Sequence, residues 1–358
     1  MKTTPYVALL LLSCLRPSEE RTEADLEVGR ASHDAVTINV ADGLAAVREL
    51  GRENIVLWAS APAWSFTLDH PGSTGDTVDL EIQNAMPDGV LDGVGATIEE
   101  LPGDVVTRKR YRLTLASSRV SLRFAPPGAT QGGTFRFALL SDVQEAIDRV
   151  GDLYARMNTE PDLSFLFGAG DLTEQGTHEQ LRRFQNELLA LDIPYYTTLG
   201  NHELGQSPTL YHEYFGRGNF SFEFRGVRFT LLDSASATLD PTVYDWLDGW
   251  LAQGRDQVHV VSMHIAPIDP TGVRNGSFAS RAEAAKLIGT LATGRVDLTV
   301  YGHVHSYYAF ENAGIPAFIS GGGGAVPERF DNVGRHFMVF EIDSELGLLA
   351  HQKIEVDD

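Results

Sequence analysis

The stretch Tyr301-Gly302-His303-Val304-His305 decides how this chain is interpreted, because it places two histidines one residue apart directly after an apolar run. In an extended backbone alternate side chains point the same way, so both imidazoles can face one site. Further apolar runs typical of β-strands also end in polar side chains, at Ser141-Asp142-Val143-Gln144, Gly170-Asp171, Gly200-Asn201-His202-Glu203 and Met263-His264. Divalent metal ions require oxygen and imidazole ligands that several rigid elements hold together. The pattern therefore predicts a metal centre, and it favours hydrolysis of phosphate esters at two metal ions.

The segments around these groups indicate an α/β domain over residues 134–358. Apolar runs alternate with segments of helical spacing; Leu181 and Phe184, for example, follow the capping-box sequence Thr177-His178-Glu179-Gln180 on one helix face. Strand–helix–strand repetition is typical of α/β folds, in which the strand ends carry the site. The run Gly321-Gly322-Gly323-Gly324 could bind a phosphate, but a tight turn after a buried strand is the favoured interpretation.

The preceding part of the chain has a different pattern. Between residues 25 and 125, short segments with period-two alternation, such as Thr77-Val78-Asp79-Leu80-Glu81-Ile82, are separated by turn residues. This predicts an all-β sandwich of the immunoglobulin or fibronectin type III kind. It contains no cluster of acids, bases or metal ligands, so a structural or positioning role is favoured, with carbohydrate or partner binding as the alternative. Prolines and glycines in residues 125–133 mark the domain boundary.

Length and composition agree with two domains and exclude one class of partner. The chain has 358 residues, of which 43% are hydrophobic and 22% charged, enough apolar material for full cores. Its formal net charge is −21, so it repels the nucleic-acid backbone and no nucleic-acid partner is expected. An anionic substrate stays compatible with this charge, because bound metal cations reverse the local field.

The N-terminus resembles an export signal. A basic start and the apolar run Tyr6–Leu12 fit a secretory signal peptide, and the run is shorter than the ~20 residues that span a bilayer. Leu11-Leu12-Ser13-Cys14 contains the one cysteine and resembles the lipobox of bacterial lipoproteins. We therefore expect a lipoprotein signal in residues 1–14 and a polar, solvated tether in residues 15–24. The mature protein would cross the inner membrane and be lipid-anchored through Cys14, in the periplasm or at the outer membrane. A conventional signal peptide with an incidental cysteine is the alternative.

With its polar groups in this order, the chain resembles the calcineurin-like metallophosphoesterases, a superfamily that includes purple acid phosphatases and phosphodiesterases. The resemblance covers residues 135–342 and implies a four-layer α/β domain with two mixed sheets flanked by helices. It also implies two divalent metal ions, which would be manganese, iron or zinc, and a small phosphorylated substrate. A hydroxide generated at the metals would attack phosphorus in a phosphomonoester or phosphodiester.

The resemblance also implies a role for individual residues. Asp171 would bridge both metals, and His202 would be catalytic, standing beside the leaving-group oxygen as a proton donor or a positive charge. Glu203 could orient His202 from outside the ligand set. Besides Asp171, the ligands of the first metal would be Asp142, Gln144 and His305, and those of the second would be Asn201, His264 and His303.

Two positions depart from the family pattern. The family usually has Asp-x-His in its first group, whereas this chain has Asp142-Val143-Gln144, so Gln144 is expected to bind the first metal through its amide oxygen and more weakly than imidazole. Purple acid phosphatases place a tyrosine three residues beyond the bridging aspartate, whereas this chain has Glu174, so a purple iron–tyrosinate centre is not expected. In the loop after His264, Arg274 is the expected phosphate-contacting cation.

The favoured function is therefore a metal-dependent phosphoesterase. The alternative from another class is a metal-binding regulatory or binding protein with little turnover, because Gln144 weakens one metal position. Retention of His202 and of the other ligands favours the enzyme. The preference for monoesters or diesters depends on the pocket walls and cannot be read from the metal ligands.

Overall fold

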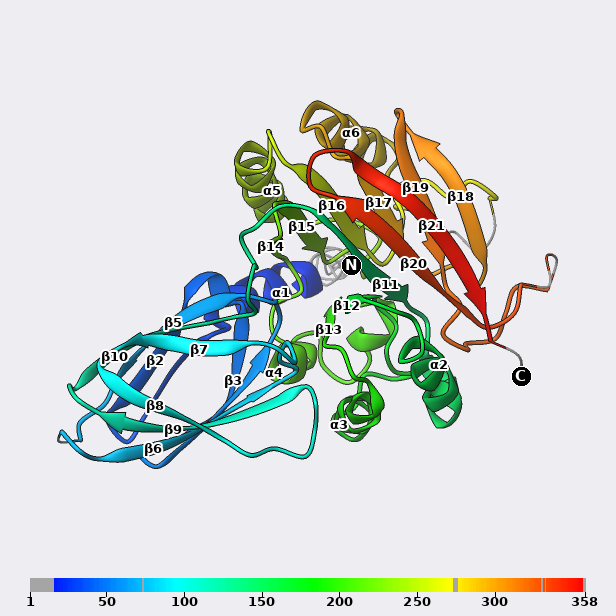
Figure 1. Cartoon of the computed structure of the whole chain (residues 1–358). Coiled ribbons are helices and arrows are strands. Elements are labelled where there is room, and N and C mark those ends of the chain that lie inside the picture. Colours follow the sequence, from blue (N-terminus) through cyan, green and yellow to red (C-terminus); the bar gives the residue numbers. More distant parts are fainter. Residues whose placement is uncertain (1–15, 73, 273–275, 330, 332, 357–358) are drawn as a thin grey trace, which may run out of the picture.

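The computed structural model describes residues 16–72, 74–272, 276–329, 331 and 333–356, and Figure 1 shows their arrangement. Two β-sheets lie in the N-terminal part of the chain, and two mixed sheets lie in the remainder. Among the described helices, none is both long enough and apolar enough to cross a membrane.

The N-terminal part is strand-rich. Its first sheet, antiparallel throughout, consists in spatial order of β1 (Arg30–His33), β2 (Val36–Val40), β5 (Trp64–Asp69), β10 (Arg119–Ala125) and β7 (Val90–Val94). The second, in which β4 and β6 are parallel, consists of β3 (Ala45–Leu50), β4 (Asn54–Ala59), β6 (Thr77–Gln83), β9 (Arg108–Leu115) and β8 (Ala96–Leu101). In β6, Val78, Leu80 and Ile82 are buried, which agrees with the period-two pattern. The likeness to immunoglobulin or fibronectin domains, and the domain limits, stay predictions.

The remainder of the chain forms two mixed sheets. One consists in order of β13 (Tyr195–Thr198), β12 (Leu163–Ala169), β11 (Thr134–Leu140), β20 (His336–Asp343) and β21 (Gly347–Glu355). The other consists of β14 (Phe220–Phe224), β15 (Val227–Leu232), β16 (Val258–Met263), β17 (Leu298–Tyr301), β19 (Ile315–Ser320) and β18 (Tyr307–Asn312). The predicted α/β domain with mixed sheets is confirmed.

Phenylalanine side chains fill the space between the two mixed sheets. The ring of Phe229 on β15 lies 5.5 Å from that of Phe137 on β11 and 5.2 Å from that of Phe167 on β12, measured between centroids. Phe165 and Phe224 approach to 5.6 Å in the same layer. Edge-to-face pairs of this kind add to the free energy of burying apolar surface. This layer fixes the two sheets face to face.

Helices cover the outer faces of both mixed sheets (Figure 1). Residues of α2 and α3 share a core with the sheet that contains β11, and residues of α5 and α6 share one with the sheet that contains β16. Thr177 caps α3 as predicted, because its side chain accepts a hydrogen bond from the N–H of Gln180. The helices are α2 (Val150–Met157), α3 (His178–Glu187), α4 (Leu210–Phe215), α5 (Pro241–Gln253) and α6 (Arg281–Thr293). Short 3-10 turns are η1 (Ala41–Gly43), η2 (Gln144–Arg149), η3 (Leu188–Ala190) and η4 (Asn201–Leu204).

The prediction of a solvated tether at residues 15–24 is wrong, because helix α1 (Arg16–Glu27) occupies this segment. Arg21 on this helix is fully buried and forms an ion pair with Asp233, with 2.5 Å between Nε and Oδ2. Asp25, also fully buried, accepts hydrogen bonds from the N–H groups of Gly218 and Asn219. A polar composition favours solvation, but these charged side chains have buried partners in the α/β domain. Helix α1 is thus a packed part of the molecule.

Candidate metal centre

The site is built where parallel strands end. Strands β11, β12 and β13 are parallel neighbours in one mixed sheet, and β16 and β17 are parallel neighbours in the other. Near the end of the ladder, Ala169 pairs with Thr198, and Met263 pairs with Tyr301. The polar groups that follow each strand are therefore delivered to one edge of each sheet. They are Asp142, Asp171, Asn201, His264 and His303.

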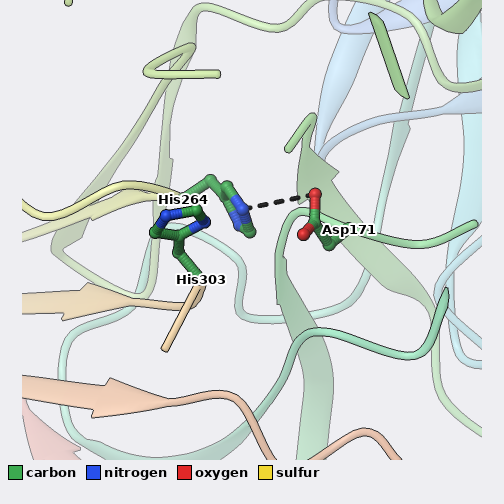
Figure 2. Close-up of side chains that lie close together, drawn as sticks. All are labelled: Asp171, His264 and His303. Carbon is green, nitrogen blue, oxygen red and sulfur yellow. Dashed lines mark ion pairs between the residues drawn. The ribbon is translucent and has the colours of Figure 1, made fainter. Parts of the chain in front are cut away.

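The structure brings these residues together in two groups that share one carboxylate. Asp171, His264 and His303 form the first group (Figure 2), and Asp142, Asp171 and His305 form the second. Within each group the potential ligand atoms lie within 4.8 Å of one another. Nε2 of His264 lies 3.2 Å from Oδ1 of Asp171, and Nε2 of His305 lies 3.5 Å from Oδ1 of Asp142. Asp171 is thus common to both groups.

The amide side chains of Asn201 and Gln144 extend the two groups. Oδ1 of Asn201 lies 3.2 Å from Nε2 of His264. The Gln144 amide nitrogen lies 2.7 Å from Oδ2 of Asp171 and 3.3 Å from Nε2 of His305. Because a half-turn of a glutamine amide exchanges its oxygen and nitrogen, the same side chain can present an oxygen ligand at this point. The structure therefore places both amides beside the residues with which the sequence grouped them.

The backbone at these positions is held in an uncommon conformation. Asp142 (φ 63°), Gln144 (φ 46°), Asp171 (φ 52°) and His303 (φ 70°) all lie in the left-handed region. For residues other than glycine this conformation costs on the order of 1–3 kcal/mol, and it persists only where the surrounding structure fixes it. Such strain, gathered on residues with one common site, indicates that their placement serves a function.

Glycines next to the ligands permit close approach of the strand ends. A Cβ atom on Gly200 would lie 2.1 Å from Oδ1 of Asp171, and one on Gly302 would lie 2.1 Å from Oγ of Ser141. Neither position can accept a side chain without displacing the site. This explains why glycine precedes Asn201 and His303 in the sequence.

Backbone carbonyl groups orient two of the histidines. Nδ1 of His264 lies 2.6 Å from the carbonyl oxygen of Ala169, and Nδ1 of His305 lies 2.7 Å from that of Val326. A carbonyl only accepts, so each Nδ1 carries the proton and donates it. Nε2 of each ring is then directed at the carboxylates, and in the neutral imidazole it offers its lone pair there. This is the arrangement that metal-binding histidines usually have.

The electrostatics of the site fit a divalent cation. Asp142 and Asp171 are almost completely buried, and their ion-pair partners among the described residues are histidines. Burial disfavours the charged form of His264, but Asp171 outweighs it and raises the pKa of His264 to about 9. Burial, together with the charge of His264, lowers the pKa of His303 to about 4. Buried carboxylates need compensating charge. The His264 imidazolium supplies part of this charge, and a divalent cation held between the imidazoles and the carboxylates would supply it in its place.

His202 lies beside the metal-facing groups without belonging to either. Its Nδ1 lies 2.7 Å from the carbonyl oxygen of Glu174, and its Nε2 lies 3.9 Å from Oδ2 of Asp171. Its side chain is 29% exposed, whereas those of Asp171 and His264 are buried. The Glu174 carbonyl fixes the ring with Nδ1 as donor, so Nε2 is the nitrogen that can exchange a proton at the site.

The expectation that Glu203 orients His202 is wrong. The carboxylate of Glu203 instead accepts hydrogen bonds from the N–H of Gly200, at 2.9 Å, and from the N–H and hydroxyl of Thr173, at 2.9 and 3.0 Å. It is fully buried, which raises its pKa to about 7, with Asp171 adding to the effect. Glu203 therefore joins the loop that carries Asp171 to the loop that carries Asn201.

Other predicted positions fall away from the centre or outside the described residues. Arg274 and Cys14 lie outside the described residues. The run Gly321–Gly324 packs against the back of the site, and its N–H groups at Gly321 and Gly323 bond to the carbonyl oxygens of Ser306 and Ser141. These N–H groups are therefore not available to a phosphate, which agrees with the favoured interpretation of a turn.

Sequence reasoning missed Asp233 and Ser234, which follow β15 just as the ligands follow their strands. Oγ of Ser234 accepts a hydrogen bond from the N–H of Ile265, the residue after His264. Asp233 is the buried partner of Arg21. The strand-end position was a signal for both residues, but their polar partners lie in distant parts of the chain.

Comparison with known proteins agrees with this geometry. The model of the calcineurin-like phosphoesterase family matches residues 135–307. A 3',5'-cyclic-nucleotide phosphodiesterase of Nostoc sp. is 25% identical over 158 residues, which cover 41% of this chain and 58% of that relative. This chain thus matches little more than half of the length of that curated relative.

Solved structures show the same fold at low identity. A purple acid phosphatase from yellow lupin (Lupinus luteus) seeds is 15% identical with a TM-score of 0.54, over 82% of this chain and 70% of the other. PhoD is 12% identical with a TM-score of 0.50, over 83% and 90% of the two chains. The family match, the mixed sheets and the strand-end donor groups lead to one assignment. Residues 135–307 of this chain belong to a calcineurin-like phosphoesterase domain.

Proposed function

We propose that this chain is a phosphoesterase that holds two divalent metal ions, such as manganese, iron or zinc, and hydrolyses a small phosphorylated substrate. The observation that supports this most directly is that Asp171 belongs to both donor groups. A single carboxylate can give one oxygen to each of two ions. The match of residues 135–307 to the phosphoesterase family supports the same function.

The residues divide between two metal positions around Asp171. When bound, two such ions activate water and stabilise the attacking and leaving oxygens of an in-line displacement at phosphorus. The chain itself supplies the ligands, fixes their orientation and shields them from bulk water, because Asp142, Asp171 and His264 are nearly inaccessible to solvent. We assign Asp142, Gln144 and His305 to one position, and Asn201, His264 and His303 to the other.

His202 is the residue we assign to proton transfer. Its Nδ1 donates to the Glu174 carbonyl, so in the imidazolium form its second proton resides on Nε2, close to Asp171. From there Nε2–H can protonate the alcohol oxygen as its bond to phosphorus breaks.

The test separates metal binding from proton transfer at two adjacent residues. Asn201→Ala should reduce metal content, measured by mass spectrometry, and excess ion should partly restore activity. His202→Ala should keep both metals and lose about 10²–10⁴-fold in kcat, the range for a positioned proton donor. The loss should be smaller for esters with good leaving groups, which need less protonation. Loss of a metal from His202→Ala would show that this residue is a ligand and not the proton donor.

The alternative function is a metal-binding protein with little turnover, and Gln144 is the observation that favours it. The two functions differ in whether metal-loaded protein hydrolyses any ester. Chromogenic monoesters and diesters, with 3',5'-cyclic nucleotides added because of the Nostoc relative, form a suitable panel with and without Mn²⁺. Full metal occupancy without hydrolysis of any of these esters would favour the binding protein.

We also propose that the protein is exported and attached to a bacterial membrane through Cys14. The support is the lipobox-like sequence that ends in this single cysteine. One acyl chain holds a protein only marginally, so stable attachment requires the several chains of a lipoprotein. Cys14→Ser should therefore abolish fatty-acid labelling and move the protein from the membrane fraction to the soluble one. Equal membrane association of both forms would refute the anchor.

A further inference from the structure

A cavity of about 460 Å³ opens beside the proposed proton donor. Two of its lining residues, Asn201 and His202, belong to the site already described. The residues that line it are Glu174, Gln175, Thr177, Asn201, His202, Gly205 and Gln206. If His202 protonates the leaving oxygen, the alcohol attached to that oxygen extends into this cavity. Its walls therefore bear on which alcohol the protein accepts.

The side chains of this cavity are suited to hydrogen bonding. Of the described residues that line it, none is Phe, Tyr or Trp, and none is Lys or Arg. A nucleobase is usually held by stacking on an aromatic ring, and an acidic group by a cation. Both features are missing from this lining, whereas amide, hydroxyl and carboxylate groups are present. The walls thus favour a small polar alcohol over an aromatic or acidic one.

Glu174 links this cavity to the proton donor. Its backbone carbonyl holds Nδ1 of His202, and its own carboxylate oxygen Oε2 lies 3.8 Å from the same nitrogen. The carboxylate is 41% exposed, so it remains accessible to a ligand. An ionised carboxylate only accepts hydrogen bonds, so its partner must be a donor.

A second carboxylate reinforces the negative charge at this place. Oε1 of Glu145 accepts a hydrogen bond from the N–H of Val326, in the loop that orients His305. The Glu145 and Glu174 carboxyl groups lie close enough for their charges to interact. Further negative charge on a ligand is unfavourable here, and a hydrogen-bond donor is favourable.

We propose that this cavity binds the leaving alcohol and that Glu174 selects alcohols that carry hydrogen-bond donors, namely amino alcohols and polyols. This inference rests on the proposed phosphoesterase function. Hydrolysis breaks the bond between phosphorus and the alcohol oxygen, forms one from the oxygen of water, and places a proton on the departing alcohol. The donor group of that alcohol faces Glu174 while His202 Nε2 supplies the proton. An ammonium group gains more than a hydroxyl, because it also neutralises charge.

The test compares four methyl phosphodiesters that differ only in the second alcohol: 2-aminoethyl, 2,3-dihydroxypropyl, propyl and 2-carboxyethyl. Alcohol release by the Mn²⁺-loaded protein is followed by NMR. Glu174→Gln keeps the backbone carbonyl that holds His202 and removes the charge. Because the ratio of kcat/KM for two esters is compared between proteins, their intrinsic reactivities cancel. The aminoethyl-to-propyl ratio should fall about tenfold in Glu174→Gln, the size of one charge-assisted hydrogen bond.

Additional esters, a control variant and binding measurements distinguish the possible outcomes. The dihydroxypropyl-to-propyl ratio should fall less, and the carboxyethyl ester should improve relative to propyl. Glu179→Gln, an exposed change in the first turn of α3, is the matched control and should leave every ratio unchanged. Equal ratios in the wild type and Glu174→Gln would overturn the inference. Dissociation constants of the same esters, from calorimetry on metal-loaded protein, test the selectivity even if no ester is hydrolysed, a result that would refute only the proposed function.

Discussion

Four of the proposed metal-facing side chains, those of Asp142, Gln144, Asp171 and His303, project from left-handed backbone. Asparagine, aspartate and histidine tolerate this region better than most other residues. The glycines around them remove the Cβ atoms that would otherwise prevent the approach. The fold thus fixes the positions of these proposed ligands through the backbone as well as through side-chain contacts.

Gln144 is the ligand position at which a change should strengthen the site. Imidazole nitrogen binds borderline divalent ions such as zinc more strongly than an amide oxygen does. Gln144→His should therefore raise the affinity for the first metal by about tenfold, and Gln144→Leu should lower it by a similar factor. Calorimetric titration of the metal-free protein measures both. Identical affinities in all three proteins would show that Gln144 is not a ligand.

His259 should make stability depend on pH. It is fully buried between β15 and β17, and burial, aided by the charge of Arg228, lowers its pKa to about 3 from its ordinary value of 6.5. Protonation therefore favours the unfolded chain. This contribution is complete above pH 6.5 and is lost as the pH falls towards 3, at up to about 1.4 kcal/mol per pH unit.

Urea unfolding of His259→Asn should show a flatter dependence on pH over this window than the wild type. His33→Asn, at a side chain that is 65% exposed, is the control and should leave the dependence unchanged. If His259→Asn and the wild type lose stability in parallel from pH 6.5 to 4, the buried imidazole is not the group responsible.

Most of the site residues could be predicted because each follows an apolar strand and the parallel ends converge. The role of Glu203 could not. Its partners, Gly200 and Thr173, lie on two loops that meet only in the folded chain. Nothing in the local sequence distinguishes a carboxylate that joins two loops from one that orients its neighbour His202.

At the scale of elements, helix α1 shows where composition misleads. Its polar sequence is typical of a solvated segment, yet Arg21 and Asp233 are separated by 212 positions and form a buried pair. The strands of the α/β part could be predicted because apolar periodicity is local. The partner of a buried charge is determined by the tertiary structure, so the periodicity of the local sequence does not indicate it.

Breaking this pair should destabilise the whole domain. Arg21→Met leaves Asp233 as an uncompensated buried charge, which typically costs about 3–5 kcal/mol. Urea denaturation at neutral pH measures the change. Arg30→Met, at an exposed arginine of β1, is the matched control and should change stability by less than about 0.5 kcal/mol. An equal effect of both variants would show that the Arg21–Asp233 pair contributes nothing.

At the scale of the whole molecule, the proposed ligands come from both mixed sheets, so bound metal should hold these sheets together. A ligand at 100 times its Kd adds about 2.7 kcal/mol to the free energy of unfolding. For a domain of this size, that corresponds to an unfolding temperature about 5–10 °C higher with Mn²⁺ than with a chelator. Calorimetric scans measure the difference, and Asp171→Asn should reduce it strongly. A chelator that leaves the wild-type transition in place would contradict a structural contribution of metal.

The packing of α1 also has a geometric consequence for the proposed anchor. Only Leu15 separates Cys14 from the first residue of this helix. The distance from Cys14 to the start of the helix is therefore at most about 7 Å, whereas a flexible tether of ten residues has a root-mean-square length of about 16–19 Å. A protein attached at this point would have much less rotational freedom relative to the membrane than one held by a long flexible tether. The proposed metal centre would then stay within a narrow range of heights above the lipid headgroups, and the dimensions of the folded protein would determine which substrates it can reach.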